Sequence, residues 1–275
     1  MFRLWRALPP RLRRRLLLGG VGVLWAAGGL VRKIPDGKSR ALLVGGSLLF
    51  LDTFFPQINL FGQTFWRGKS PSSFALTFDD GPDPRITPRL LDLLGETGFR
   101  ATFFVLLERA HRWPEILRSL KEEGHEIALH GWSHRKIWTL SPGAFSRELE
   151  KACQAFRELL GGPPRWYRPP HGFIRLDQAL LLRRFGLRLA GWTVGVWDTD
   201  PEVTAEEIYR RVMETLLPGD ILLLHDGVAD RQRPQKAMLQ ALASILQELK
   251  SRRIRAVTLT DLWEETTKRP CAALA

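Results

Sequence analysis

The stretch Thr77-Phe78-Asp79-Asp80-Gly81-Pro82 places two adjacent carboxylates at the end of a short apolar run, Ser73–Phe78, with the length and flanks of a buried strand. Neighbouring side chains on a strand point to opposite faces, so the carboxylates can converge only if the strand ends there. The Gly-Pro pair is suited to ending it. Two carboxylates in one pocket repel, and a nearby cation is needed to keep both ionised. The stretch therefore predicts a site with a positive charge; a solvated turn is the alternative.

After this strand, the chain alternates between strand-like and helical patterns. The strand-like runs are Ser73–Phe78, Ala101–Leu106, His125–Leu129, Arg165–Arg168, Leu187–Val194, Asp220–Leu224 and Arg255–Leu259. The helical patterns are Thr87–Glu96, Trp113–Glu123, Ala144–Leu160, Leu176–Phe185, Ala205–Leu217 and Gln235–Arg252. Such alternation builds βαβ units and a parallel sheet. No glycine-rich phosphate motif follows the first strand, so we expect an α/β fold, a distorted (β/α)-barrel of about seven parallel strands.

The net charge of +12 is concentrated at one end of the chain. Residues 1–40 hold ten Lys and Arg against one acid, which leaves a net +3 for the other 235 residues. A nucleic-acid-binding domain would carry its basic residues on the folded part, so we expect no nucleic-acid partner. Two cysteines, Cys153 and Cys271, are too few for a disulfide framework and lack zinc-site spacing.

The N-terminal region has the pattern of a membrane anchor. A basic segment at residues 11–15 precedes an uncharged run, Leu16–Val31, which an Arg-Lys pair closes. Sixteen residues are slightly short for a bilayer, but snorkelling arginines can extend the span. A cleaved signal peptide is the alternative, although Trp25 stands where a small residue is wanted. A second apolar run, Ala41–Phe55, could cross back, lie on the surface or pack on the next domain, so one and two crossings stay open.

These patterns divide the chain into four parts. We expect a membrane-anchoring region at 1–60, a linker at 61–72, a catalytic domain at 73–263 and a disordered tail at 264–275. The expected location is a membrane-anchored domain that faces the cell envelope, with secreted and cytoplasmic-facing locations as alternatives.

Titratable side chains follow several predicted strands, at the ends where active sites form in such folds. Asp79 and Asp80 follow the first strand, and His130 and His134 follow the third. Two histidines four residues apart share one face of a helical turn, and two histidines with one carboxylate form a common catalytic metal shell. Rings held only by core hydrogen bonds are the alternative. The metal interpretation supplies the cation that the paired carboxylates require.

Later strands end in further polar residues. Arg168 precedes two prolines that stiffen the backbone, and a fixed guanidinium beside a carboxylate keeps it ionised. His225 closes the apolar run 221–224 and is suited to donating a proton near neutral pH. Asp198 is its expected partner, because Asp226 comes next on the same strand and should face the other way.

Together these motifs resemble the NodB-type polysaccharide deacetylases, carbohydrate esterase family four, over about residues 73–263. Residues 77–82 match the first family motif without change. The second match is His130-Gly-Trp-Ser-His134, with Gly131 in place of the usual Ser or Thr. The third is Arg168-Pro-Pro-His171-Gly172, with His171 in place of an aromatic residue, and Leu222-Leu-Leu-His225 matches the fifth.

The fourth motif departs most from the family pattern. Trp192 and Asp198 keep the expected separation, but Gly195 stands where Asp is usual and Thr199 where Trp is usual. These departures put the sugar contacts and the shape of the site in question more than the chemistry.

The resemblance implies a role for each motif residue. The implied ligands of one divalent metal ion, zinc before other transition metals, are Asp80, His130 and His134. Asp79 would take a proton from the attacking water, with Arg168 holding it in place. His225 would protonate the leaving amine, with Asp198 tuning it, and the backbone N–H of His171 would help to hold the oxyanion.

The resemblance also implies an N-acetylated polysaccharide as substrate, in peptidoglycan or another GlcNAc-containing envelope glycan. Leu222 or Leu224 could line a pocket for the acetyl methyl group, and Trp197 could contact the sugar. Indole faces suit sugar rings, although each tryptophan near the motifs could equally be core: Trp132, Trp138, Trp166, Trp192 and Trp197. Hydrolysis of another amide or an O-acetyl ester is an alternative, as is a catalytically inactive glycan-binding module.

Overall fold

The predicted first strand, β2 (Ser73–Asp79), lies inside the sheet, and all of its residues are buried. Phe74, Leu76 and Phe78 belong to the large core that the helices cover. Ala75 packs in a smaller core with residues of other strands. Because side chains alternate along a strand, Thr77 and Asp79 share the face of Ala75 and point into the curled sheet.

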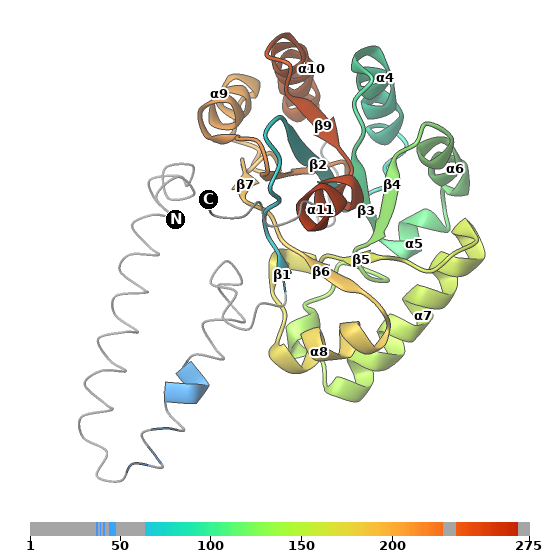
Figure 1. Ribbon diagram of the computed structural model, residues 1–275. Helices are drawn as coiled ribbons and strands as arrows, with labels where there is room; N and C mark the ends of the chain where they lie inside the picture. Colours follow the sequence, from blue (N-terminus) through green and yellow to red (C-terminus); the bar gives the residue numbers. More distant parts are fainter. Residues whose placement is uncertain are drawn as a thin grey trace.

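The computed structural model describes residues 37, 39, 41, 44–47, 64–227 and 235–268. Six longer helices surround the strands on the outside (Figure 1): α4 (Thr87–Thr97), α6 (Pro114–Glu122), α7 (Pro142–Leu160), α8 (Leu176–Arg184), α9 (Ala205–Thr215) and α10 (Lys236–Ser251). Each matches a predicted helical run to within two residues at either end.

The sheet is parallel throughout. Its order is β1 (Thr64–Phe65), β6 (Arg188–Ala190), β5 (Trp166–Tyr167), β4 (Glu126–Leu129), β3 (Thr102–Val105), β2, β8 (Ile221–His225) and β7 (Val194–Gly195). A further strand, β9 (Arg255–Val257), pairs with the first half of β2. The carboxyl ends of the strands therefore meet at one edge, as the βαβ pattern predicts.

One predicted strand, Leu187–Val194, is broken in two. Its first part, β6, pairs with β5, and its second part, β7, pairs with β8 near the other end of the sheet order. Only residues 191–193 separate the two parts, so this segment brings distant strands together. The sheet is thus a curled, partly closed barrel. The break falls at Gly191, where a Cβ would overlap the indole ring of Trp66.

Within the described residues, some elements extend beyond the predicted pattern. Strand β1 lies in the segment predicted as a linker, and α5 (Leu107–Ala110) is a short helix that was not expected. Helix α11 (Leu259–Thr267) runs four residues into the predicted tail, so disorder from residue 264 is wrong for those four residues.

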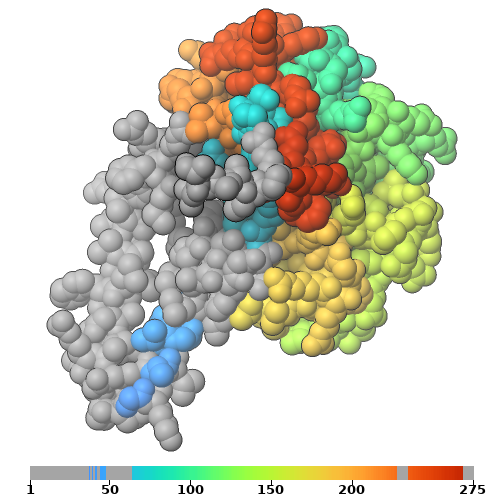
Figure 2. All heavy atoms as spheres, in the orientation of Figure 1, coloured from blue at the N-terminus to red at the C-terminus, as the bar shows by residue number. Residues whose placement is uncertain are grey.

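Helix α11 closes the inside of the sheet at one end. Thr258 caps it by accepting a hydrogen bond from the backbone N–H of Asp261, and its apolar residues Leu259 and Leu262 join Ala75 and Trp166 in the smaller core. In the space-filling view, red C-terminal atoms lie beside the cyan atoms that begin the described domain (Figure 2).

The predicted membrane anchor, Leu16–Val31, lies outside the described residues, as does most of the run Ala41–Phe55. Residues 44–47 are helical. Within the part of the chain that the structure describes, no helix combines the length and the apolar character that a bilayer crossing requires.

Candidate active site and metal centre

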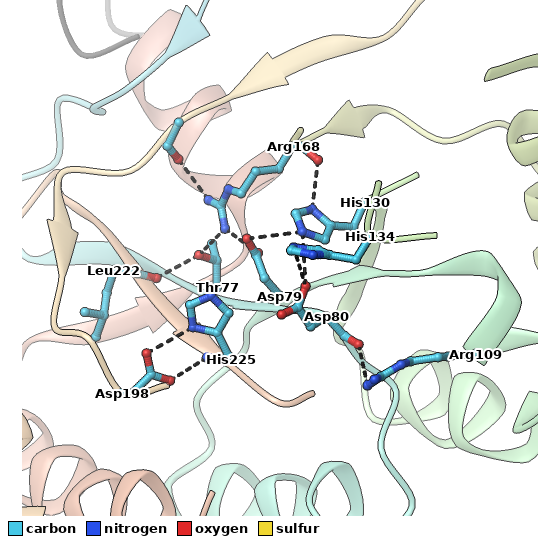
Figure 3. A network of polar contacts seen from close by, with 11 residues as sticks. Thr77, Asp79, Asp80, Arg109, His130, His134, Arg168, Asp198, Leu222 and His225 are labelled. Carbon is cyan, nitrogen blue, oxygen red and sulfur yellow. Dashed lines mark hydrogen bonds and ion pairs between the residues drawn. The ribbon is translucent and has the colours of Figure 1, made fainter. Parts of the chain in front are cut away.

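A sharp turn at the end of β2 converts two adjacent carboxylates into a convergent pair. Asp79 is the last residue of the strand, and Asp80 has a left-handed backbone conformation with φ of 74°. Aspartate tolerates this region better than most residues, at a cost of about 1 kcal/mol. The strand therefore ends where the sequence predicted. The two side chains project into one site (Figure 3).

Three side chains point their ligand atoms at a common volume. The Oδ1 atom of Asp80 lies 3.3 Å from Nε2 of His130 and 3.3 Å from Nε2 of His134. One ligand atom from each of the three residues lies within 4.8 Å of the others. Such an arrangement is what a shared cation requires.

The surroundings of one buried oxygen, Asp80 Oδ1, indicate whether a metal ion fits these three residues. Asp80 Oδ1 is buried and accepts no hydrogen bond from the described residues, although two imidazole nitrogens lie 3.3 Å away. A buried carboxylate oxygen without a hydrogen bond is costly unless another group satisfies it. An oxygen and two imidazole nitrogens are a donor set that suits a divalent transition metal, so the residues fit the ion.

The orientation of His130 is fixed from behind. Its Nδ1 atom lies 2.8 Å from the carbonyl oxygen of Arg168. A carbonyl only accepts, so Nδ1 carries the proton, and the lone pair of a neutral ring is on Nε2, facing Asp80. Metal-binding histidines are commonly held this way.

The histidines also keep Asp80 ionised. Burial works to raise the pKa of this carboxyl, but the neighbouring imidazoles of His130, His225 and His134 hold the pKa well below its usual value. The carboxylate form is the one that binds a cation.

Arg168 is fully buried and bonds three oxygens, two from strand β2 and one from Gly191. Its Nη1 atom donates to Asp79 Oδ1 at 2.7 Å and to Thr77 Oγ1 at 2.8 Å, and Nη2 donates to the carbonyl oxygen of Gly191 at 2.8 Å. Thr77 in turn donates to the carbonyl oxygen of Leu222 at 2.7 Å. Removing one partner of a buried pair like Arg168 and Asp79 typically costs about 3–5 kcal/mol. The guanidinium therefore fixes the orientation of Asp79 (Figure 3).

A second histidine–carboxylate pair lies across the site. His225 Nδ1 is 3.0 Å from Asp198 Oδ1, and the backbone N–H of His225 donates to Asp198 Oδ2 at 2.8 Å. Burial would lower the pKa of His225, but the charge and hydrogen bond of Asp198, with Asp80 and Asp79 nearby, raise it to about 10. The ring is therefore protonated at neutral pH and can act as an acid.

Asp226 points away from this pair, in agreement with its predicted orientation. It is fully buried, and its Oδ2 atom accepts a hydrogen bond from Thr87 Oγ1 at 2.7 Å. The carboxylate lies behind the catalytic turn, so close that a Cβ on Gly81 would overlap it. Burial raises the pKa of Asp226 to about 7.

The structure corrects the predicted acetyl pocket. Leu222 and Leu224 are both fully buried in the large core against the helices. Since strand residues alternate, Leu223 shares the face of His225 and Thr77, and it is paired in register with Thr77. The candidate pocket residue is thus Leu223, one position away from the predicted residues.

The third motif gives His171 an unusual backbone and an aromatic setting. Its φ is 60°, and its ring lies 4.2 Å from that of His134 and 5.3 Å from that of Trp138, measured between centroids. The side chain of His171 therefore borders the candidate metal ligands instead of lying apart from the site.

Three of the five tryptophans near the motifs differ in their exposure. Trp166 is 1% exposed and belongs to the core, and Trp192 packs against the smaller core. Trp197 is 39% exposed and has φ of 61°, directly before Asp198. Trp197 is thus an exposed tryptophan that a substrate can reach, and its left-handed backbone places it directly before the Asp198–His225 pair.

In the fourth motif, Gly195 packs closely against the indole of Trp192. A Cβ on Gly195 would lie 3.2 Å from Trp192 Nε1, so the glycine allows the indole to approach the strand closely. Asp198 nevertheless reaches His225 without the Asp that is usual at this position. The departure at Gly195 therefore leaves the acid pair intact.

Sequence reasoning missed three residues that hold the site together. Thr77 and Gly191 accept from Arg168, and Arg109 Nη1 donates to the carbonyl oxygen of Asp80 at 3.0 Å. Thr77 lies within the first motif, and its parity with Asp79 on the strand was a usable signal. Gly191 acts through its backbone, and Arg109 lies on the unpredicted helix α5, so neither gave a signal.

The curled parallel sheet brings an Asp-His-His set beside a carboxylate that an arginine holds and beside a protonated histidine. This arrangement defines a class of hydrolases that act on acyl groups. The model of the polysaccharide deacetylase family matches residues 67–190. A peptidoglycan-N-acetylglucosamine deacetylase of Bacillus cereus is 35% identical over 192 residues, which cover 68% of this chain and 86% of that protein.

Further relatives agree with this match. A chitooligosaccharide deacetylase of Bradyrhizobium is 36% identical over 157 residues, 56% of this chain and 71% of that protein. The solved structure of a peptidoglycan deacetylase from Bacillus subtilis is 30% identical, with a TM-score of 0.65, over 72% of this chain and 93% of that one. The chain belongs to the polysaccharide deacetylase family, and it is a deacetylase hydrolase.

Proposed function

We propose that the protein uses a divalent metal ion to remove acetyl groups from N-acetylated sugars of an envelope polysaccharide. The observation that carries the proposal is the convergence of Asp80, His130 and His134 beside Asp79, which a buried arginine holds. The similarity to enzymes named for peptidoglycan and chitooligosaccharide deacetylation supports the substrate class.

The proposed ion is zinc, held by Asp80, His130 and His134. Zinc accepts carboxylate oxygen and imidazole nitrogen and, at catalytic sites, keeps a position open. When bound, such a cation lowers the pKa of water from about 16 to about 7 and polarises a carbonyl group.

Asp79 is the proposed general base. Arg168 bonds its Oδ1 atom, and the other oxygen, Oδ2, lies 4.0 Å from Nε2 of His130 on the side of the candidate metal ligands. In this proposal, Oδ2 accepts a proton from the attacking water while the water oxygen adds to the acetyl carbonyl carbon. The hydrogen bond from Arg168 to Oδ1 fixes the orientation of Asp79, so Oδ2 faces the candidate metal ligands.

His225 is the proposed general acid. Asp198 occupies its Nδ1 atom, which leaves the Nε2–H free to donate a proton to the sugar nitrogen as the C–N bond breaks. The products are acetate and a free amine. Leu223, on the same strand face, is the proposed contact for the acetyl methyl group, and Trp197 the proposed contact for the sugar.

We also propose that residues 1–60 anchor the enzyme to a membrane with the catalytic domain facing the envelope. The basic segment and apolar run at residues 11–33 support this location. Fractionation of cells that express the full chain, with protease added to intact spheroplasts, tests it. Recovery of the protein in the soluble fraction, or protection of the domain from protease, would contradict it.

Acetate release from the purified full chain tests the activity. We expect release from peptidoglycan or N-acetyl chitooligosaccharides, little from an O-acetylated xylan or a simple linear amide, and about one divalent ion per chain by elemental analysis. Preference for the ester or the simple amide would move the enzyme to another substrate class. A protein without metal and without turnover would instead be a glycan-binding module.

A further inference from the structure

We propose that Trp66, in the segment that precedes the catalytic motifs, is a positioning residue for the proposed base, Asp79. The inference rests on the proposed function of Asp79 and Arg168. Trp66 lies outside the five sequence motifs, so this role is additional to those of the motif residues. Trp66 follows β1, the two-residue strand that lies in the predicted linker.

Strand β1 joins the sheet beside β6. Thr64 and Phe65 pair in register with Leu189 and Ala190 of β6, and the backbone N–H of Gly191 donates to the carbonyl oxygen of Phe65 at 3.0 Å. The pairing places the next residue, Trp66, over the position at which β6 ends.

The indole of Trp66 packs directly against Gly191. A Cβ on Gly191 would overlap three ring atoms of Trp66, so the indole lies directly on the glycine Cα. The ring also packs at 6.0 Å from that of Trp192, between centroids. Its Nε1 atom is buried and makes no hydrogen bond within the described residues, so packing rather than polarity accounts for the contact.

Arg168 connects Gly191 to the proposed base, Asp79. Its carbonyl oxygen accepts from Nη2 of Arg168 at 2.8 Å, and Nη1 of the same guanidinium donates to Asp79 Oδ1 at 2.7 Å. On the other side, Phe104 lies 4.1 Å from Arg168 Cζ, measured to the ring centroid. The position of the Gly191 carbonyl thus decides where the guanidinium lies, and Trp66 decides where Gly191 lies.

Substitutions in the full chain test this proposal. A small displacement of a catalytic group can lower turnover by about a hundredfold, which is the effect expected for Gly191→Ala, because the new Cβ collides with Trp66. Trp66→Ala is expected to lower kcat by about tenfold with KM nearly unchanged, since Arg168 contacts the base and not the sugar. The double variant should recover to the level of Trp66→Ala, because the cavity accepts the added methyl.

Trp263→Ala is the matched control. Trp263 is a partly buried tryptophan that packs against the smaller core through Trp166 and lies in α11. Its loss should lower the melting temperature by an amount similar to Trp66→Ala while kcat is retained. Equal kcat for Trp66→Ala and Trp263→Ala, or a double variant as inactive as Gly191→Ala, would overturn the proposal.

A readout independent of turnover separates this inference from the proposed function. The guanidinium NMR signals of Arg168, assigned by their loss in Arg168→Lys, should shift in Trp66→Ala and stay in place in Trp263→Ala. Unchanged signals in Trp66→Ala would refute the positioning role even in an active enzyme. Absence of acetate release by the unmodified protein, with shifted signals in Trp66→Ala, would refute the proposed function alone.

Discussion

Two histidine–carboxylate groups lie on either side of Asp79, and they differ in geometry more than in composition. On one side, Nε2 atoms of His130 and His134 face a single oxygen of Asp80 at 3.3 Å without a hydrogen bond to it. On the other, Nδ1 of His225 bonds Asp198 at 3.0 Å, and the backbone N–H of His225 bonds the same carboxylate.

This comparison shows how the same residue types serve two purposes. A carboxylate oxygen left without a hydrogen bond between two imidazoles is available to a cation. A carboxylate that accepts two hydrogen bonds from one histidine instead stabilises the protonated ring. The second contact of each ring decides the outcome: a backbone carbonyl holds His130, whereas Asp198 holds His225.

The largest effect is expected from removing one of the candidate metal ligands. His130→Ala should abolish binding of stoichiometric metal and reduce kcat by more than about a thousandfold, because the cation supplies several kcal/mol of transition-state stabilisation. Elemental analysis and acetate release measure both. His111→Ala, outside the ligand set, is the control and should keep metal and turnover. Full metal content in His130→Ala would remove this ring from the ligand set.

Loss of the acid side should leave the metal in place. His225→Ala is expected to lower kcat by about 10²–10⁴-fold, the usual range for a general acid, with one divalent ion still bound. The two sides are thus separable by metal content. Turnover equal to that of the unmodified enzyme would exclude His225 from proton transfer.

A subtler change should alter the pH dependence of the acid. Asp198 raises the pKa of His225, so its protonated form persists to about pH 10. In Asp198→Asn the pKa of His225 falls, and the alkaline limb of kcat/KM should move to lower pH. Asp200→Asn, an exposed neighbour, should leave the profile in place. An unmoved alkaline limb in Asp198→Asn would mean that another group defines it.

The smallest effect is expected at the border of the metal side. His171→Tyr restores the usual aromatic residue and keeps the backbone N–H proposed for the oxyanion, so kcat/KM should change by no more than about twofold. Steady-state kinetics on chitooligosaccharides check it. A loss of tenfold or more would show that the imidazole itself takes part.

Much of this site was predictable because its residues lie at strand ends. Two adjacent carboxylates before Gly-Pro, two histidines four apart and a histidine closing an apolar strand each indicate where a strand stops. The six longer helices and the parallel sheet follow from the periodicity of the chain. These features depend on local pattern, which a sequence displays directly.

The parts that could not be predicted depend on contacts between distant segments. The strand 187–194 reads as continuous, yet it breaks at Gly191, which contacts Trp66 and Arg168 from elsewhere in the chain. The error at Leu222 and Leu224 has a different origin. Side chains alternate along a strand, so the position of His225 places Leu223, and neither Leu222 nor Leu224, on the same face.

The buried acid behind the catalytic turn has a consequence for stability. Asp226 titrates near pH 7 in the folded protein, whereas an exposed aspartate titrates near 3.8. Between these two values the folded chain retains a proton that the unfolded chain releases, so the free energy of unfolding falls as the pH rises across this interval, by about 1.4 kcal/mol per pH unit at most. Urea titrations at pH 4.5 and 7.5, with Asp226→Asn for comparison, measure the difference. The turn that carries Asp79 and Asp80 is therefore packed against a neutral carboxyl group in mild acid and against a carboxylate anion in mild alkali.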